Sequence, residues 1–149
     1  MQSNKIQITI VISEFHSIIT ERLLNGALDA FNAWELNNKE IMVHRVPGAF
    51  EIPSTINQII KNNKPAAIIA VGCVIRGETS HYDFVAGESA RCLADLSLKY
   101  NLPIINGILT TENNLQAMER SKLGGNNRGY DAMLATIKMI KVYEKIQST

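Results

Sequence analysis

The sequence predicts an α/β fold, a three-layer sandwich in which helices flank both faces of a four-stranded parallel sheet. Residues 66–71 are small or β-branched and apolar without polar alternation, which is typical of a strand buried on both faces. Apolar side chains then recur at helical spacing from residue 81 to about residue 100. The same succession of strand and helix recurs along the chain, which favours a parallel sheet with right-handed crossovers.

The first half of the chain contains two such units. Apolar residues predict a strand over 6–12 and a helix over 19–31. A second strand is predicted over 40–46, and a helix follows over 49–60. Pro53 falls in the first turn of that helix, where its missing N–H leaves no hydrogen bond unmade.

The second half continues the pattern. Residues 76–81 join the central strand to its helix, and a fourth strand is predicted over 103–109. A short helix around 115–120 and a longer one over 129–143 close the chain. The glycines and asparagines of 124–127 separate these two helices.

Polar or glycine-bearing connections follow all four predicted strands. They lie at Phe15, at 48–51, at 76–81 and at Thr110 with Thr111. Because the carboxyl ends of parallel strands meet at one edge of a sheet, these connections are expected to converge there. That edge is the usual place for a ligand in an open α/β sheet.

Length and composition narrow the possible functions. A chain of 149 residues without an internal repeat or a linker predicts one domain over 1–149. Its 15 basic and 14 acidic residues are interspersed and give a net charge of +1, which indicates neither nucleic acid nor a membrane as a partner. Uncharged runs such as 65–75 are far too short to span a bilayer, and residues 1–5 lack a signal-peptide core. We therefore expect a cytoplasmic protein.

The cysteines and histidines do not indicate a metal centre. Cys73 and Cys92 have no closely spaced cysteine or histidine partner, so we expect two free thiols packed as small hydrophobic residues. His16, His44 and His81 likewise lack the spacing of metal ligands.

His81 is the best-placed candidate for general acid–base catalysis. An ordinary imidazole titrates near neutral pH, and His81 begins a helix beside other polar groups. A histidine at this position is equally consistent with a helix cap or a bond to a turn. Residues 77–80 offer main-chain N–H groups at the same helix start, where an anion can bind, although many such turns bind nothing.

Four further residues have both a binding and a structural interpretation. Arg120 and Arg128 flank a turn and can clamp a phosphate, but a basic last turn in a helix that ends at Gly124 is also ordinary capping. Phe15 can stack on a planar ring or belong to the core. Glu51 can bind hydroxyls, or it can be a first-turn carboxylate favoured by the helix dipole.

Four segments together carry a resemblance to a known family. They read VPGAFEIP at 46–53, GCVIRGETSHYDFV at 72–85, GILTTE at 107–112 and ERSKLGGNNRG at 119–129. In this combination they resemble the 6,7-dimethyl-8-ribityllumazine synthase family, over nearly the whole chain from residue 6 to about residue 139. The resemblance implies a flavodoxin-like fold and the penultimate step of riboflavin synthesis. In that step 5-amino-6-(D-ribitylamino)uracil condenses with 3,4-dihydroxy-2-butanone 4-phosphate, releasing phosphate and water, without a cofactor.

The resemblance also implies which residues bind the pyrimidine substrate. Phe15 would stack on the ring, and Glu51 would hold the ribityl hydroxyls. The main chain would bind the polar edge of the ring at four residues: Ala49, Phe50, Val74 and Ile75.

The same resemblance assigns the proton and phosphate chemistry. His81 would move protons during the condensation. Arg120 would hold the phosphate together with main-chain groups of Glu78 and Thr79. Arg128 stands where the family usually has a lysine near the ligand.

Besides Arg128, three positions depart from the usual pattern of the family. Asn106 stands where many members carry a phenylalanine that lines the pocket, and His16 stands where an asparagine usually follows the stacking aromatic residue. Lys122 is displaced from the usual lysine position in its segment. These departures bear on ring packing and substrate affinity more than on the reaction.

Two other functions are weighed against this one. The first is a non-catalytic flavin- or lumazine-binding shell protein. The presence of His81 and Arg120 argues against this function, and Asn106 argues mildly for it. The second is a flavodoxin-like electron carrier, which would need a phosphate-binding turn after the first strand. Residues 13–17 lack glycine and match such a turn poorly.

The resemblance implies a homo-oligomer as well. Family members form pentamers, decamers or icosahedral sixty-subunit shells, and the short turn after Arg120 resembles that of shell-forming members. We expect a shared active site at the subunit interfaces. Phe15, Glu51 and His81 would come from one subunit, and Arg120 and Arg128 from its neighbour.

Overall fold

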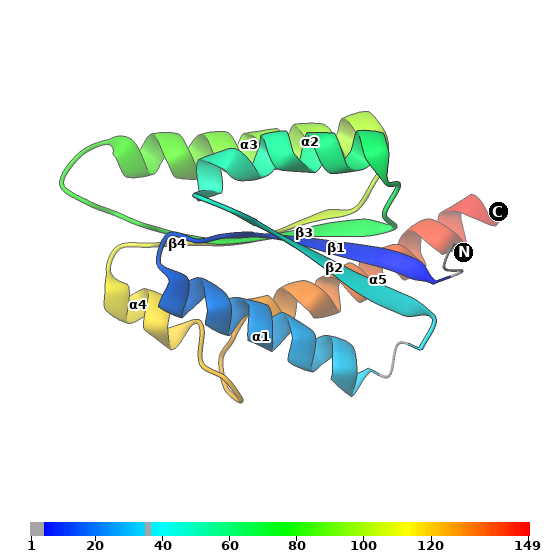
Figure 1. Ribbon diagram of the computed structural model, residues 1–149, viewed down its shortest axis with the longest axis horizontal. Helices are drawn as coiled ribbons and strands as arrows, with labels where there is room; N and C mark the ends of the chain where they lie inside the picture. Colours follow the sequence, from blue (N-terminus) through cyan, green and yellow to red (C-terminus); the bar gives the residue numbers. More distant parts are fainter. Residues whose placement is uncertain (1–4, 35–36) are drawn as a thin grey trace.

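A computed structural model describes residues 5–34 and 37–149 of the chain. It contains one parallel sheet with the strand order β2-β1-β3-β4, and a layer of helices lies on each face of it (Figure 1). The strands are β1 (Ile6–Ser13), β2 (Lys39–Val46), β3 (Ala67–Ile75) and β4 (Ile104–Thr111). The helices are α1 (Ser17–Ala33), the short 3₁₀ helix η1 (Ala49–Glu51), α2 (Ile52–Asn62), α3 (His81–Tyr100), α4 (Asn114–Glu119) and α5 (Arg128–Gln147). The predicted α/β fold and its strand–helix alternation are confirmed.

The two central strands supply a core on each side of the sheet. Successive side chains of a strand point to opposite faces. Ile10 and Ile12 of β1 therefore pack beneath α1, α4 and α5, whereas Val11 packs beneath α2 and α3. Strand β3 is buried from Ala67 to Val74, which explains why its sequence is apolar without alternation.

A close approach of α1 and α5 holds one helical layer together. A side chain at Gly129, in the first turn of α5, would place its Cβ 1.8 Å from the carbonyl oxygen of Leu23 in α1. Gly26 similarly faces the side chain of Asn127, which would lie 2.1 Å from a Cβ there. Only glycine permits contact this close between the two helices.

Most predicted boundaries lie within a few residues of the observed ones. Pro53 does occupy the first turn of α2, after a 3₁₀ turn that the sequence analysis had placed within the helix. The short helix predicted around 115–120 is confirmed as α4, whereas the alternative in which a helix ends at Gly124 is wrong. Helix α4 ends at Glu119, because Ser121 then pairs with Asn127 in an antiparallel bridge that closes a tight turn.

No helix within residues 5–34 and 37–149 combines the length and apolar character needed to cross a bilayer.

Candidate functional site

A cavity of about 570 Å³ opens at the carboxyl edge of the sheet, between the sheet and the layer formed by α2 and α3. Three of the connections predicted to converge contribute to its wall, together with the end of β3. The lining residues are Phe15, His16, Gly48, Ala49, Phe50, Glu51, Cys73, Val74, Ile75, His81, Phe84 and Val85. Parallel strands that end at a common edge produce this convergence.

The segment after β1 is held by the segment after β2. The main-chain N–H groups of Glu14 and Phe15 donate hydrogen bonds to the carbonyl oxygen of Pro47, at 3.2 and 3.0 Å. His16 then adopts a left-handed conformation with φ of 58° and begins α1. These bonds fix the backbone at Phe15, whose side chain remains 68% exposed. The exposure excludes the alternative that Phe15 belongs to the core.

Gly48 allows the Phe15 ring and the Glu51 carboxylate to approach the same point of the backbone. A Cβ at Gly48 would lie 3.1 Å from Cδ2 of Phe15 and 3.1 Å from Oε1 of Glu51. Within the described part of the chain, no hydrogen bond or ion pair engages the Glu51 carboxylate. Its acceptor oxygens are therefore available to hydroxyl groups of a ligand.

His81 is the first residue of α3 and lines the cavity. Its main-chain N–H donates a hydrogen bond to Oγ1 of Thr79 at 3.3 Å, so the threonine hydroxyl satisfies a main-chain donor at the start of the helix. The imidazole makes no hydrogen bond or ion pair with any residue that the structure describes. The structure therefore excludes the alternative in which the His81 side chain caps the helix.

Three phenylalanines from separate elements line this one cavity with more than half of their surface exposed. Phe15 is 68% exposed, Phe50 61% and Phe84 66%. Large apolar side chains gathered in this way mark a binding surface more often than an isolated exposed residue does. The sequence analysis missed Phe84, although its position three residues after His81 places it on the same face of α3.

Cys73 is a second lining residue that the sequence analysis did not assign to the site. It is buried near the end of β3, and the burial raises the pKa of its thiol from 9.0 to about 11. A thiol with that pKa stays protonated near neutral pH, so it is not poised as a nucleophile. The expectation that both cysteines are free thiols is confirmed.

Arg120 and Arg128 do not line this cavity of their own chain. Arg120 follows α4 and Arg128 begins α5, and both helices belong to the other helical layer, with α1 (Figure 1). In this layer the Arg120 side chain donates from Nη1 to the carbonyl oxygen of Gln116 at 3.0 Å, which is a helix C-terminal cap. Arg128 is the first residue of α5, where the helix dipole disfavours a cation.

Three more of the predicted binding residues lie outside the lining. Glu78 and Thr79 are exposed on the connection between β3 and α3, next to His81. Asn106 is exposed on the edge strand β4, where its Oδ1 accepts a hydrogen bond from the main-chain N–H of Ile108 at 3.0 Å. The described residues contain no group of three potential metal ligands.

The comparisons with known proteins agree with the motifs that surround this cavity. A profile of the family described as 6,7-dimethyl-8-ribityllumazine synthase matches residues 5–144. The chain belongs to this family. It is 42% identical over 146 residues to a 6,7-dimethyl-8-ribityllumazine synthase from Campylobacter hominis, covering 98% of this chain and 94% of that protein.

Lumazine synthases are transferases of riboflavin biosynthesis, and membership of the family confirms the resemblance on which the sequence analysis relied. Among solved structures, the chain is similar to one from Bacteroides fragilis NCTC 9343 whose description names an acylhydrolase. That similarity has a TM-score of 0.42 at 13% identity and covers 95% of this chain and 89% of the other. It is too low to inform the activity.

Proposed function

We propose that the cavity at the carboxyl edge is the site where this chain condenses 5-amino-6-(D-ribitylamino)uracil with 3,4-dihydroxy-2-butanone 4-phosphate. One observation carries the proposal. In a member of the lumazine synthase family, exposed phenylalanines, an unengaged carboxylate and an unengaged imidazole surround a single cavity. A planar, polyhydroxylated substrate needs an aromatic face, hydroxyl acceptors and a proton carrier together.

The pyrimidine substrate fits the side of the cavity between β1 and α2. Phe15 stacks on the ring, and Glu51 accepts hydrogen bonds from the ribityl hydroxyls. The polar edge of the ring meets main-chain groups of four residues: Ala49, Phe50, Val74 and Ile75.

The chemistry proceeds by proton transfers and loss of a leaving group. The substrate amine attacks the ketone and loses water to form an imine, phosphate is eliminated, and ring closure releases a second water. His81 moves protons in these steps. The main chain at Glu78 and Thr79 holds the phosphate, and the cavity gains rate by keeping two reactants together.

The phosphate site needs a cation that this cavity does not receive from its own chain. We propose that Arg120 and Arg128 of a neighbouring subunit supply it, in a homo-oligomer that is a pentamer or a shell of pentamers. The three exposed phenylalanines support this proposal, because a neighbouring subunit would cover them in the assembly. A biosynthetic enzyme of this kind, with balanced surface charge, fits a cytoplasmic location and requires neither nucleic acid nor membrane as a partner.

The direct test mixes the purified protein with both substrates and follows lumazine absorbance and phosphate release in parallel. Equal molar amounts of lumazine and phosphate over many turnovers are expected. A protein that binds lumazine tightly yet releases no phosphate would be a non-catalytic binding shell, and the proposal would be rejected.

A further inference from the structure

Arg76 lies outside the cavity lining but joins the end of β4 to the connection and the helix that border the cavity. Its main-chain N–H donates to the carbonyl oxygen of Thr111, at the end of β4, at 2.9 Å. Its Nε is 2.7 Å from Oε2 of Glu112, and its Nη1 is 3.3 Å from Oδ1 of Asp83 in α3. Its guanidinium carbon also lies 4.3 Å from the centre of the Tyr82 ring.

These contacts tie both ends of the connection between β3 and α3 to one guanidinium. Arg76 itself begins the connection, and Tyr82 and Asp83 are the two residues that follow His81. Glu112, just beyond β4, anchors the same side chain to the sheet. A planar guanidinium can bond two carboxylates and stack on a ring at the same time, which a lysine ammonium cannot reproduce.

Little else restrains the residues between those ends. Gly77, Glu78, Thr79 and Ser80 are all exposed, and a Cβ at Gly77 would meet no atom within 4 Å. The bond from the His81 N–H to the Thr79 hydroxyl is local to the connection. The position of the connection relative to the sheet therefore depends on what holds its two ends.

We infer that Arg76 is a positioning residue, which holds the 77–80 main chain and His81 at the productive distance from the cavity. The inference rests on the proposed function, since it concerns the phosphate and proton groups of that site. The Arg76 side chain is 40% exposed, and exposed ion pairs contribute little to folding. A displacement of about 1 Å in an active site, by contrast, can cost about 100-fold in rate. Removing Arg76 should therefore damage catalysis far more than stability.

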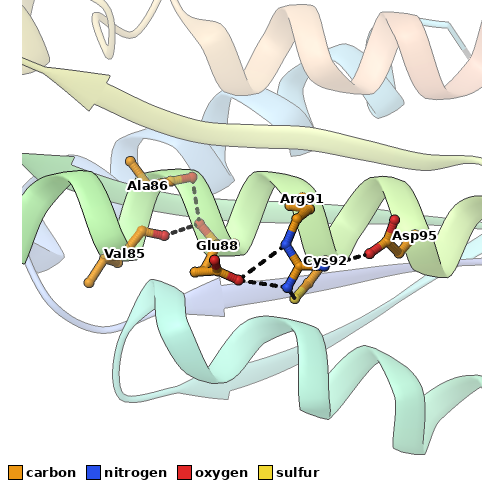
Figure 2. A network of polar contacts seen from close by, with 7 residues as sticks. Val85, Ala86, Glu88, Arg91, Cys92 and Asp95 are labelled. Carbon is orange, nitrogen blue, oxygen red and sulfur yellow. Dashed lines mark hydrogen bonds and ion pairs between the residues drawn. The ribbon is translucent and has the colours of Figure 1, made fainter.

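Arg91, which lies within α3, provides a matched control (Figure 2). It bridges two carboxylates as Arg76 does, with Nη2 2.7 Å from Oε2 of Glu88 and Nη1 2.9 Å from Oδ2 of Asp95. Both partners lie within α3, so the loss of Arg91 removes a similar ion network without releasing the 76–81 connection.

The experiment compares Arg76→Ala, Arg76→Lys and Arg91→Ala in the full-length assembled enzyme. We expect Arg76→Ala to lower kcat/KM by about 10- to 100-fold, mainly through a higher KM for the phosphate-bearing substrate. Arg76→Lys should recover only part of the lost kcat/KM. The KM for the pyrimidine substrate should stay near the wild-type value, because Phe15 and Glu51 lie on other segments. A loss of folded protein alone would lower apparent kcat and leave both KM values unchanged. Arg91→Ala should match the wild type in both KM values, at a thermal stability similar to that of Arg76→Ala.

Glu112→Gln separates positioning from direct attraction between Arg76 and phosphate. If Arg76 acts through position, this variant should also raise the KM for the phosphate-bearing substrate, because the anchor is weakened. If Arg76 binds phosphate directly, loss of a competing carboxylate should leave that KM unchanged or lower it, and the inference would be overturned. Kinetics for Arg76→Ala that equal those of Arg91→Ala would overturn it as well. An inactive wild-type enzyme would instead reject the proposed function, and the inference with it.

Discussion

The main-chain N–H of Arg128 donates a hydrogen bond to the carbonyl oxygen of Arg120, at 2.9 Å. The turn between them is closed by the pairing of Ser121 with Asn127 and is anchored to α1, because Nδ2 of Asn127 donates to the carbonyl oxygen of Arg22 at 3.1 Å. Two cationic residues on either side of a short turn are thus held at adjacent backbone positions. Such a pair is suited to a shared anion.

Arg120→Ala should damage use of the phosphate-bearing substrate most. Loss of a charge-assisted hydrogen bond worth about 1.5–3 kcal/mol predicts a KM for that substrate that is about 10- to 100-fold higher. Steady-state kinetics with each substrate varied in turn checks this, and Arg120→Lys should be intermediate. Wild-type KM and kcat in Arg120→Ala would show that the phosphate is bound elsewhere.

His81→Ala should lower kcat by about 100-fold or more while leaving measurable activity. The residual rate comes from holding the two substrates together, which does not need the imidazole. The pH profile of kcat should differ between the wild type and the variant, because the variant lacks the group that moves the proton. A variant that retained the wild-type pH profile would refute the assigned proton transfer.

Two variants with complementary defects should restore one another's activity if the active site is shared. Glu51→Ala removes one half of the site and Arg120→Ala the other, so subunits unfolded together and reassembled should restore activity at roughly one quarter of the ring interfaces. Each variant reassembled alone is the control. Mixed rings that are demonstrated by mass but are no more active than either variant reassembled alone would place both residues in the pocket of one subunit.

Gly129→Ala should destabilise the subunit, and Gly87→Ala should not. The first adds a Cβ against the backbone of Leu23, so α1 and α5 must separate, at a cost of about 1–3 kcal/mol or more. Gly87 lies in α3 with no atom within 4 Å of the added Cβ, and alanine there should stabilise the helix by about 0.5–1 kcal/mol. Urea unfolding at one fixed protein concentration compares them, and equal midpoints would contradict the close helix contact.

Cys73 should make the folded state lose stability at alkaline pH. Its pKa in the folded state, about 11, lies above the ordinary value of 9.0, so the folded chain keeps a proton that the unfolded chain releases. This contribution is complete below pH 9 and is lost as the pH rises toward 11. The free energy of unfolding of the wild type should fall relative to Cys73→Ala by about 1 kcal/mol between pH 9 and pH 10. A difference between the two proteins that stays constant over that range would contradict the buried thiol.

The sequence by itself determined the strands, their alternation with helices and the edge of the sheet at which the candidate site lies. Strand β3 could be predicted because a strand buried on both faces must be apolar at every position. Phe15, Glu51 and His81 could be placed together because each follows a parallel strand, and the carboxyl ends of such strands share one edge.

Only the tertiary structure decided the contacts that depend on how whole elements pack. Phe84 of α3 and Cys73 of β3 line the same cavity, although no periodicity in the sequence pairs these two elements. Arg120 is separated from the cavity because α4 packs in the other helical layer. Arg76 bonds to Glu112, which lies 36 residues away in the sequence. Periodicity reports which face of an element is buried. It does not report which other element covers that face, because this depends on distances across the core that no local pattern contains.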